Sequence, residues 1–253
     1  MKNNYNIADD EWEWYIGQLY YRLIKEFFIS GLNNVVELAP GFRYKIAYAL
    51  KEFNFSGNIY IVDSSQDVLD YVNKKYKEII PKANIICINK KFEDCLNLLP
   101  NDIDLFLSNH SIDDLIISNY SDCEYNKESN NELLLNDLLE LWKKLYKNKE
   151  SKNRIISKVY DSFKLFFNKK NIRYAIIGQY RSNLYYLGKS NYIDEIVEEC
   201  FNGIKKLTDT DNKRINQILD FYPFGKDDER YNGKYLIDNT QNAKHWIAGK
   251  IKK

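Results

Sequence analysis

Acidic residues stand at the ends of three apolar runs in the first hundred residues. Glu37 lies at the end of "NVVEL", four residues before Gly41, Asp63 ends "NIYIVD", and Glu93 follows "NIICIN". Carboxylates accept hydrogen bonds from ammonium and hydroxyl groups, and one placed about twenty residues after a first turn can hold both hydroxyls of a ribose. A turn that only reverses the chain needs no such acid, so these positions indicate a ligand site.

The elements that hold these acids follow from the alternation of apolar runs with helical periodicity. Continuous apolar strands that alternate with helices are typical of parallel strands buried on both faces. The predicted strands cover 34–39, 58–63, 84–89 and 102–109, and the predicted helical segments cover 42–54, 65–79 and 92–99. We therefore predict an α/β fold with a doubly wound, mostly parallel sheet.

The rest of the chain adds helices on both sides of this sheet. An amphipathic helix is predicted ahead of it, at 9–30, and a fifth strand at 172–180, and the segments "KYLIDN" and "KHWIAGKIKK" predict a C-terminal antiparallel hairpin. Further helices are expected at 132–147, 153–168 and 192–207. We expect an N-terminal helical cap over 1–32 and one domain over 33–253, with a helical insertion around 119–168.

The amino-acid composition limits the kinds of partner and site that we expect for this protein. The 37 basic and 36 acidic residues give a net charge of +1, so no global field recruits nucleic acid or an anionic membrane. The four cysteines show no CxxC spacing and there are two histidines, so we expect neither a metal site nor a disulfide framework. No apolar run reaches transmembrane length, and we expect a cytoplasmic protein, with a homo-oligomer left open.

The first turn carries a resemblance to a known family. Glu37-Leu38-Ala39-Pro40-Gly41-Phe42-Arg43 is similar to the pattern acid-x-Gly-x-Gly-x-Gly, with Ala39 and Arg43 in place of two glycines. With Asp63 and "FED" at 92–94 in order behind it, residues 30–120 resemble the class I S-adenosylmethionine-dependent methyltransferases. The resemblance implies a Rossmann-like domain that binds S-adenosylmethionine and releases S-adenosylhomocysteine.

The resemblance also implies roles for single residues. The turn would pass the methionine part of the cofactor, Asp63 with Ser64 would hold the ribose, and the segment from Phe92 to Asp94 would cover the adenine. The cofactor-binding candidates are Glu37, Ala39, Pro40, Gly41, Asp63, Ser64, Phe92, Glu93, Asp94 and Asn109.

The turn "NHSIDD" follows the fourth predicted strand, where the family places substrate or catalytic groups. His110 titrates near neutrality and could take a proton from an acceptor, with Asp113 or Asp114 orienting it. These three are the catalytic candidates. Substrate-side candidates are Trp14, Tyr15, Tyr180 and Arg181, from an aromatic-rich helix and a tyrosine-rich segment.

Structural alternatives exist for each of these residues. Strand-end acids also cap helices, and Phe92 fits a core position. "SIDD" can simply begin a helix, with His110 as a structural residue. Aromatic residues at helical spacing more often pack than bind, and the segment that includes Tyr180 and Arg181 can be surface.

Methyl transfer to a nitrogen or oxygen of a small-molecule acceptor is the leading interpretation. The sequence "SNHSIDD" differs from the Asn-Pro-Pro-aromatic signature of amino-group methylation on bases, and we expect no nucleic-acid partner. Aminocarboxypropyl transfer from the same cofactor and a non-catalytic module that binds a cofactor or a partner remain alternatives. A dinucleotide-dependent reductase fits less well, because "ELAPGFRYK" lacks the glycines that contact a pyrophosphate.

Overall fold

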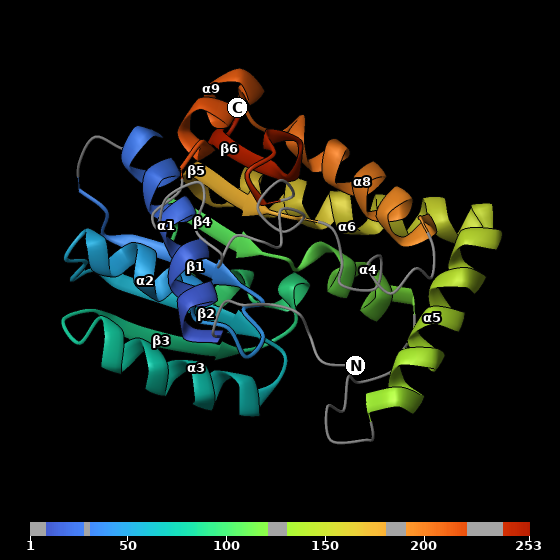
Figure 1. The fold of residues 1–253 in the computed structure, drawn as a ribbon, viewed down its shortest axis with the longest axis horizontal. Coiled ribbons are helices and arrows are strands. Elements are labelled where there is room, and N and C mark those ends of the chain that lie inside the picture. The colour runs from blue at the N-terminus through green and yellow to red at the C-terminus, as the bar shows by residue number, and fades with distance from the viewer. Residues whose placement is uncertain (1–8, 28–30, 121–130, 181–190, 222–239) are drawn as a thin grey trace.

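The chain folds around one twisted sheet with helices on both faces (Figure 1). A computed structural model describes residues 9–27, 31–120, 131–180, 191–221 and 240–253. The strand order is β3-β2-β1-β4-β5-β6; β1 to β5 are parallel, and β6 runs antiparallel to β5. The strands are β1 Asn34–Leu38, β2 Asn58–Asp63, β3 Asn84–Asn89, β4 Asp102–Asn109, β5 Asn171–Gly178 and β6 Trp246–Lys250.

The strand order reverses direction at β1, and this reversal creates the switch point of the sheet. From β1 the chain proceeds outward through β2 to β3 and then returns to place β4 on the other side of β1. The crossovers use α2 (Lys45–Glu52), α3 (Gln66–Ile79), and the short helices η1 (Phe92–Asp94) and η2 (Leu96–Leu98). In open parallel sheets, ligands bind beyond the carboxyl ends of the strands at this point.

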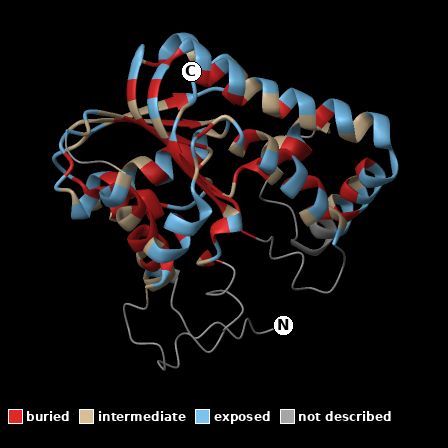
Figure 2. Cartoon of the chain, turned by 90° about the horizontal axis from the view of Figure 1, so that it is seen from above, coloured by how far each residue is buried: buried red, intermediate tan, exposed pale blue. Residues whose placement is uncertain are grey.

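Strand side chains alternate between two hydrophobic cores, as the pleat requires. One core holds Val35, Ile59 and Leu107 under α1 (Asp9–Phe27), α2, α3 and α9 (Asn212–Leu219). The other holds Val36 and Phe106. It packs under α4 (Ile112–Tyr120), α5 (Asn131–Lys147), α6 (Lys149–Lys169) and α8 (Tyr192–Lys205). Figure 2 shows the buried residues concentrated along the strands and on the helix faces turned toward them.

Helix α3 shows how the local sequence sets an element. Ser65 accepts a hydrogen bond from the Val68 amide at 3.4 Å and caps the helix start, where Asp67 adds favourable negative charge. Val72 and Tyr76 follow Val68 at four-residue steps and are buried against the sheet. The capping residue and this periodicity predicted the helix, and the structure confirms it.

Helix α1 packs directly on the sheet and on α2. Ile16, Leu19 and Leu23 are fully buried in the first core. A Cβ atom at Gly17 would lie 2.7 Å from the carbonyl oxygen of Lys45, so only glycine allows the two helices to approach this closely. The helix therefore contributes to the main core, and the boundary predicted at residue 32 stays a prediction.

The predicted fold class is confirmed, and so are the five predicted parallel strands. The pairing of β6 with β5 confirms the antiparallel end of the sheet, while "KYLIDN" lies outside the described residues. Segment 92–99 forms two 3-10 helices. Helix α9 was not predicted, because its eight residues are mostly polar.

Three further findings concern membrane-spanning helices, metal-binding groups and cysteines. Among the described residues, no helix is long and apolar enough to cross a membrane. In the same part of the chain, no group of three or more His, Cys, Asp or Glu side chains could hold a metal ion. Cys87, Cys95 and Cys200 are free thiols.

Candidate functional site

The turn after β1 has the backbone shape that a ligand-binding turn needs. Ala39 and Gly41 both have positive φ, at 48° and 58°. The Ala39 amide donates to the carbonyl of Val62 at 2.8 Å, which holds the turn against the end of β2. Left-handed backbone is costly for a residue with a Cβ, so Ala39 occupies a position that would favour glycine. Ala39 and Gly41 are partly buried, and Pro40 between them is buried.

Glu37 lies at the end of β1 and is almost completely buried, with 2% of its surface exposed. The Tyr76 hydroxyl of α3 donates a hydrogen bond to its Oε2. Burial raises the pKa of Glu37 to about 8; the Tyr76 hydrogen bond opposes this shift, and repulsion from Glu13 and Asp63 adds to it. A buried carboxyl with acidic neighbours favours a cationic ligand, because a nearby positive charge would relieve the repulsion.

Asp63 is the last residue of β2 and Ser64 follows it, next to this turn. Asp63 Oδ1 accepts a hydrogen bond from the Ser65 amide at 2.9 Å, and the Ser64 carbonyl accepts one from the Asn89 side chain at 3.1 Å. Asp63 is half-buried and Ser64 is exposed. Asp63 thus binds the backbone just before α3, whose cap is Ser65, and ribose binding by Asp63 or Ser64 stays a prediction.

Residues 92–94, which follow β3, lie partly in the core and partly at the surface. The Phe92 ring is buried and lies 5.0 Å from the ring of Phe163, between centroids, which fits the core alternative for this side chain. Glu93 accepts a hydrogen bond from Asn119 of α4 at 3.3 Å. Asp94 is exposed. An adenine contact from this segment stays a prediction.

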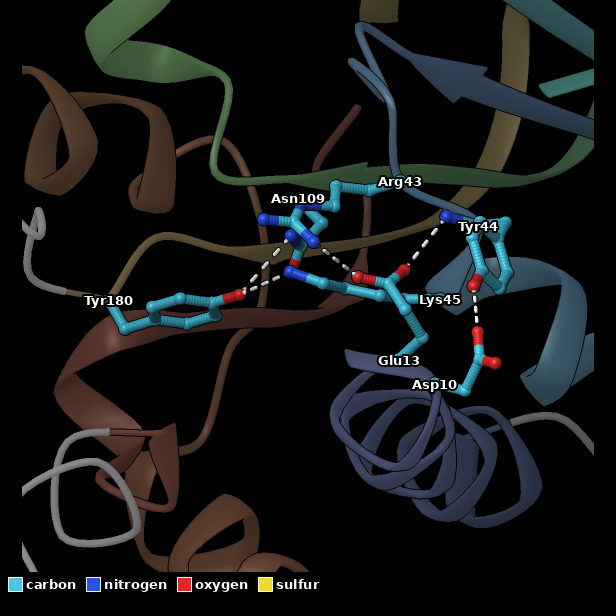
Figure 3. Close-up of polar contacts among 7 residues, drawn as sticks. All are labelled: Asp10, Glu13, Arg43, Tyr44, Lys45, Asn109 and Tyr180. Atoms are coloured by element: carbon cyan, nitrogen blue, oxygen red, sulfur yellow. Dashed lines mark hydrogen bonds and ion pairs between the residues drawn. The ribbon is translucent and has the colours of Figure 1, made fainter. Parts of the chain in front are cut away.

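A polar network joins the ends of β4 and β5 to the start of α2 (Figure 3). The Tyr180 hydroxyl oxygen accepts hydrogen bonds from Lys45 Nζ at 2.8 Å and Asn109 Nδ2 at 3.3 Å. Behind them, the Tyr20 hydroxyl donates to the Ser108 carbonyl at 2.6 Å. Lys45, Asn109 and Tyr180 come from three separate parts of the chain, and all are at least 92% buried. The sequence predicts no role for Lys45. Its position four residues after Gly41 is the feature of the sequence that could have pointed to it.

A second set of contacts in Figure 3 ties α1 to the same turn. Glu13, with 1% exposure, accepts a hydrogen bond from the Tyr44 amide at 2.9 Å and pairs with Arg43 at 3.3 Å. The Tyr44 hydroxyl donates to Asp10. These contacts give the residues just before α2 a fixed position, although α2 has no side-chain cap of its own.

His110 follows Asn109 with a positive φ of 57°, and its amide donates to the Gly178 carbonyl at 2.7 Å. Its Nδ1 lies 3.3 Å from Asp113 Oδ2, and Gln179 donates to the other oxygen of Asp113 at 3.1 Å. Burial would lower the pKa of His110, but Asp113 outweighs it and raises the pKa to about 9. A pKa of about 9 favours the protonated imidazole at neutral pH, and a catalytic role for His110 stays a prediction.

A pocket open to solvent lies beside this pair, at the carboxyl end of β5. Its wall includes Asp113, Gln179, Tyr180, Glu198, Lys244 and His245. Asp114 is exposed on the first turn of α4.

The remaining substrate-side candidates lie in different surroundings. Tyr15 is fully buried and accepts a hydrogen bond from Gln241 at 3.1 Å, which fits the packing alternative. Trp14 is partly buried, and Arg181 lies outside the described residues. Of the substrate-side candidates, Tyr180 is the residue that the structure brings to the strand ends.

Comparison with known proteins gives likenesses of structure alone. No family model and no curated protein matches the sequence. The chain is similar to the bifunctional kinase-methyltransferase WbdD, with TM-score 0.43 and 10% identity over 74% of this chain and 34% of that one. It is also similar to a putative rRNA-methylase from Clostridium thermocellum, with TM-score 0.43 and 11% identity over 76% and 81% of the two chains. A third similar structure is a SAM-dependent methyltransferase from Aquifex aeolicus, with TM-score 0.37 and 13% identity over 72% and 80%.

The matched region thus spans about a third of the WbdD chain.

Proposed function

We propose that this chain is an S-adenosylmethionine-dependent methyltransferase that methylates a nitrogen or oxygen of a small-molecule acceptor. One observation carries the proposal. A left-handed turn after β1, the buried Glu37 and the strand-end Asp63 meet at the switch point of a doubly wound sheet. Ligands of this fold class bind there, and a glycine-like turn lets the backbone approach them.

The residues present fit such a cofactor. Its ammonium and sulfonium groups are cations, and Glu37 is a buried acid whose pKa is raised by burial and by repulsion from Glu13 and Asp63, more than Tyr76 and Lys45 lower it. Asp63 has a carboxylate at the adjacent strand end for the two ribose hydroxyls. Backbone at Ala39 and Gly41 would pass the amino-acid part of the cofactor.

The cofactor supplies a methyl group activated by a sulfonium. The acceptor's nucleophile attacks this carbon in line with the carbon–sulfur bond, so alignment accounts for much of the rate. Tyr180, two residues beyond β5, lines a pocket in which we expect the acceptor to lie. Near-neutral charge and a pocket lined by residues of α4, α8 and the short helix η4 (Ala243–His245) and by Gln179 and Tyr180 support a small acceptor.

Calorimetric titration with S-adenosylhomocysteine tests cofactor binding. We expect Asp63→Ala to lose about 1.5 to 3 kcal/mol of affinity, as the loss of hydrogen bonds to a charged group usually costs. Asp67→Ala removes an exposed acid four residues away and should leave affinity unchanged. No binding by the folded wild type would overturn the proposal.

Product analysis tests the bond that breaks. Methyl transfer releases S-adenosylhomocysteine, whereas aminocarboxypropyl transfer releases methylthioadenosine. A panel of amines and hydroxyl compounds, incubated with cofactor and enzyme, should give the first product. Formation of the second product would assign the alternative reaction, and binding without turnover of any acceptor would favour a non-catalytic module.

A further inference from the structure

The Tyr180 oxygen receives two hydrogen bonds from groups that can only donate at those atoms. Lys45 Nζ lies 2.8 Å away and Asn109 Nδ2 lies 3.3 Å away. Ammonium and amide nitrogens carry protons and no free lone pair for a hydrogen bond. Two donors that converge on one phenol oxygen stabilise negative charge on it.

Among the described residues, Lys45 lies in direct ion-pair contact with no carboxylate, although its charge acts on the buried Glu37. It is 6% exposed, and no ion pair within 4.0 Å in the described ranges includes it. A buried ammonium is costly unless an anion balances it. Tyr180 is its hydrogen-bond partner, so an ionised Tyr180 would supply that anion.

A second positive charge lies close to the Tyr180 ring. The His110 imidazole, held protonated by Asp113, has its centroid 5.0 Å from that of Tyr180. Burial would raise the pKa of Tyr180, but Lys45 and then His110 outweigh it, and the pKa falls below its usual value. The candidate base suggested by the sequence, His110, therefore contributes charge, while its neighbour becomes able to accept a proton.

The position of Tyr180 matches the acceptor side of the proposed site. It stands two residues beyond the end of β5, contacts Asn109 at the end of β4, and forms part of the pocket wall with Gln179 and Asp113. A phenolate oxygen with two donors can still accept a third hydrogen bond, here from the acceptor. Other titratable groups that face this region are Tyr20, Glu198, Lys244 and His245.

We propose that Tyr180 is the general base of the transfer reaction, with Lys45 and Asn109 as positioning residues that stabilise its phenolate. This inference rests on the proposed function. As the acceptor's nitrogen or oxygen attacks the methyl carbon, its bond to hydrogen breaks and the proton moves to the Tyr180 oxygen. The carbon–sulfur bond breaks with its electron pair on sulfur, which becomes a neutral thioether. Water then removes the proton from Tyr180.

Absorbance of tyrosinate in the near ultraviolet tests the ionisation without any acceptor. Below the usual tyrosine pKa of about 10, wild type should gain one tyrosinate that Tyr180→Phe does not, because Lys45 and His110 lower the pKa of Tyr180. Lys45→Met keeps the phenol and should move that step upward by at least one pH unit. Tyr146→Phe, an exposed tyrosine of α5, is the matched control and should keep the early step. Identical titrations of wild type and Tyr180→Phe below the usual tyrosine pKa of about 10 would overturn the proposal.

Turnover provides the second measurement. With any acceptor that releases S-adenosylhomocysteine, Tyr180→Phe should lower kcat about 100-fold or more, as loss of a general base does, while S-adenosylhomocysteine affinity stays unchanged. Full kcat in a folded Tyr180→Phe variant would overturn the base assignment while leaving methyl transfer intact. Absence of S-adenosylhomocysteine binding by wild type would instead remove the proposed function, whereas the titration still decides whether Tyr180 ionises early.

Discussion

The Tyr76 hydroxyl of α3 donates a hydrogen bond to Glu37 at the end of β1, and both side chains are buried. This contact fixes the acid that begins the first turn. Burial outweighs the hydrogen bond, and the pKa of Glu37 rises to about 8 from an unperturbed 4.5. The folded protein therefore holds a proton on Glu37 in a pH range where the unfolded chain has released it.

This shift predicts a pH-dependent effect of Glu37→Gln. A raised folded pKa gives stability that is fully present below about pH 4.5 and is lost as pH rises through about 8. Glutamine cannot ionise and can still accept from Tyr76. Relative to wild type, Glu37→Gln should gain at least about 1 kcal/mol of unfolding free energy between pH 6 and pH 9, because one pKa unit corresponds to 1.36 kcal/mol. Denaturant unfolding at both pH values measures it.

Asp104 is a control for Glu37, because its pKa is shifted in the opposite direction. Burial would raise its pKa, but the amides of Asn34 and Asn33 and the guanidinium of Arg173 lower it below its usual value. Its stabilisation is present above the unfolded pKa and is lost as pH falls through the folded pKa. Asp104→Asn should therefore destabilise the protein equally at pH 6 and pH 9. A pH-independent difference between wild type and Glu37→Gln would contradict the assignment at Glu37.

The left-handed backbone at Ala39 predicts that glycine is tolerated better there than alanine. Left-handed φ costs an L-residue about 1 to 2 kcal/mol, while the extra freedom of glycine in the unfolded chain costs about 0.4 to 1. Ala39→Gly should leave the unfolding free energy unchanged or raise it by up to about 1 kcal/mol. Ala49→Gly, the same change inside helix α2, should lower it by about 1 kcal/mol. Thermal unfolding of both variants compares them, and a loss at both positions would refute the strain argument.

The strands and most helices could be predicted because their signals are local. Val35 to Leu38 form a continuous apolar run apart from Glu37, and α3 carries both a serine cap and a four-residue repeat. The first turn was found through its resemblance to a family motif. Its positive φ at Ala39 was not predictable, since alanine seldom adopts that backbone.

The polar network was beyond the reach of the sequence for a physical reason. Lys45 and Tyr180 are 135 residues apart, and they meet because β4 and β5 lie next to β1 in the sheet. The sequence pointed to His110 as a base from its position and its ordinary pKa. Whether it is protonated depends on burial and on Asp113, whose orientation is set by Gln179 from another strand end.

The His110 and Asp113 pair predicts a measurable titration. The raised pKa of His110 means that its stabilising charge is present below about pH 6.5 and is lost as pH rises through about 9. Nuclear magnetic resonance of the imidazole protons should show one of the two histidines titrating near pH 9, and His245→Gln assigns the signals. Asp113→Asn should lower the pKa of His110, because Asp113 is the strongest of the groups that raise it and burial opposes them. A wild-type His110 that titrates near 6.5 would refute the ion pair.

Close packing around Gly178 predicts that a larger residue there will destabilise the protein. It ends β5, its amide donates to the Tyr20 hydroxyl at 3.1 Å, and an added Cβ would lie 2.9 Å from that oxygen and 3.0 Å from the Trp246 ring. Both rings are fully buried, so neither can move aside freely. Gly178→Ala should lower the unfolding free energy by about 1 to 3 kcal/mol, as overpacking usually does.

A shift of Tyr20 in Gly178→Ala should also move the polar network, because Tyr20 contacts the end of β4 through the Ser108 carbonyl. We therefore expect the early tyrosinate step of Tyr180 to shift in Gly178→Ala. Gly203→Ala is the matched control: its Cβ would lie 3.4 Å from Tyr160, and alanine favours the interior of α8, so stability should rise by up to about 1 kcal/mol. Equal effects of the two substitutions on unfolding would show that the contact between Gly178, Tyr20 and Trp246 is not tight.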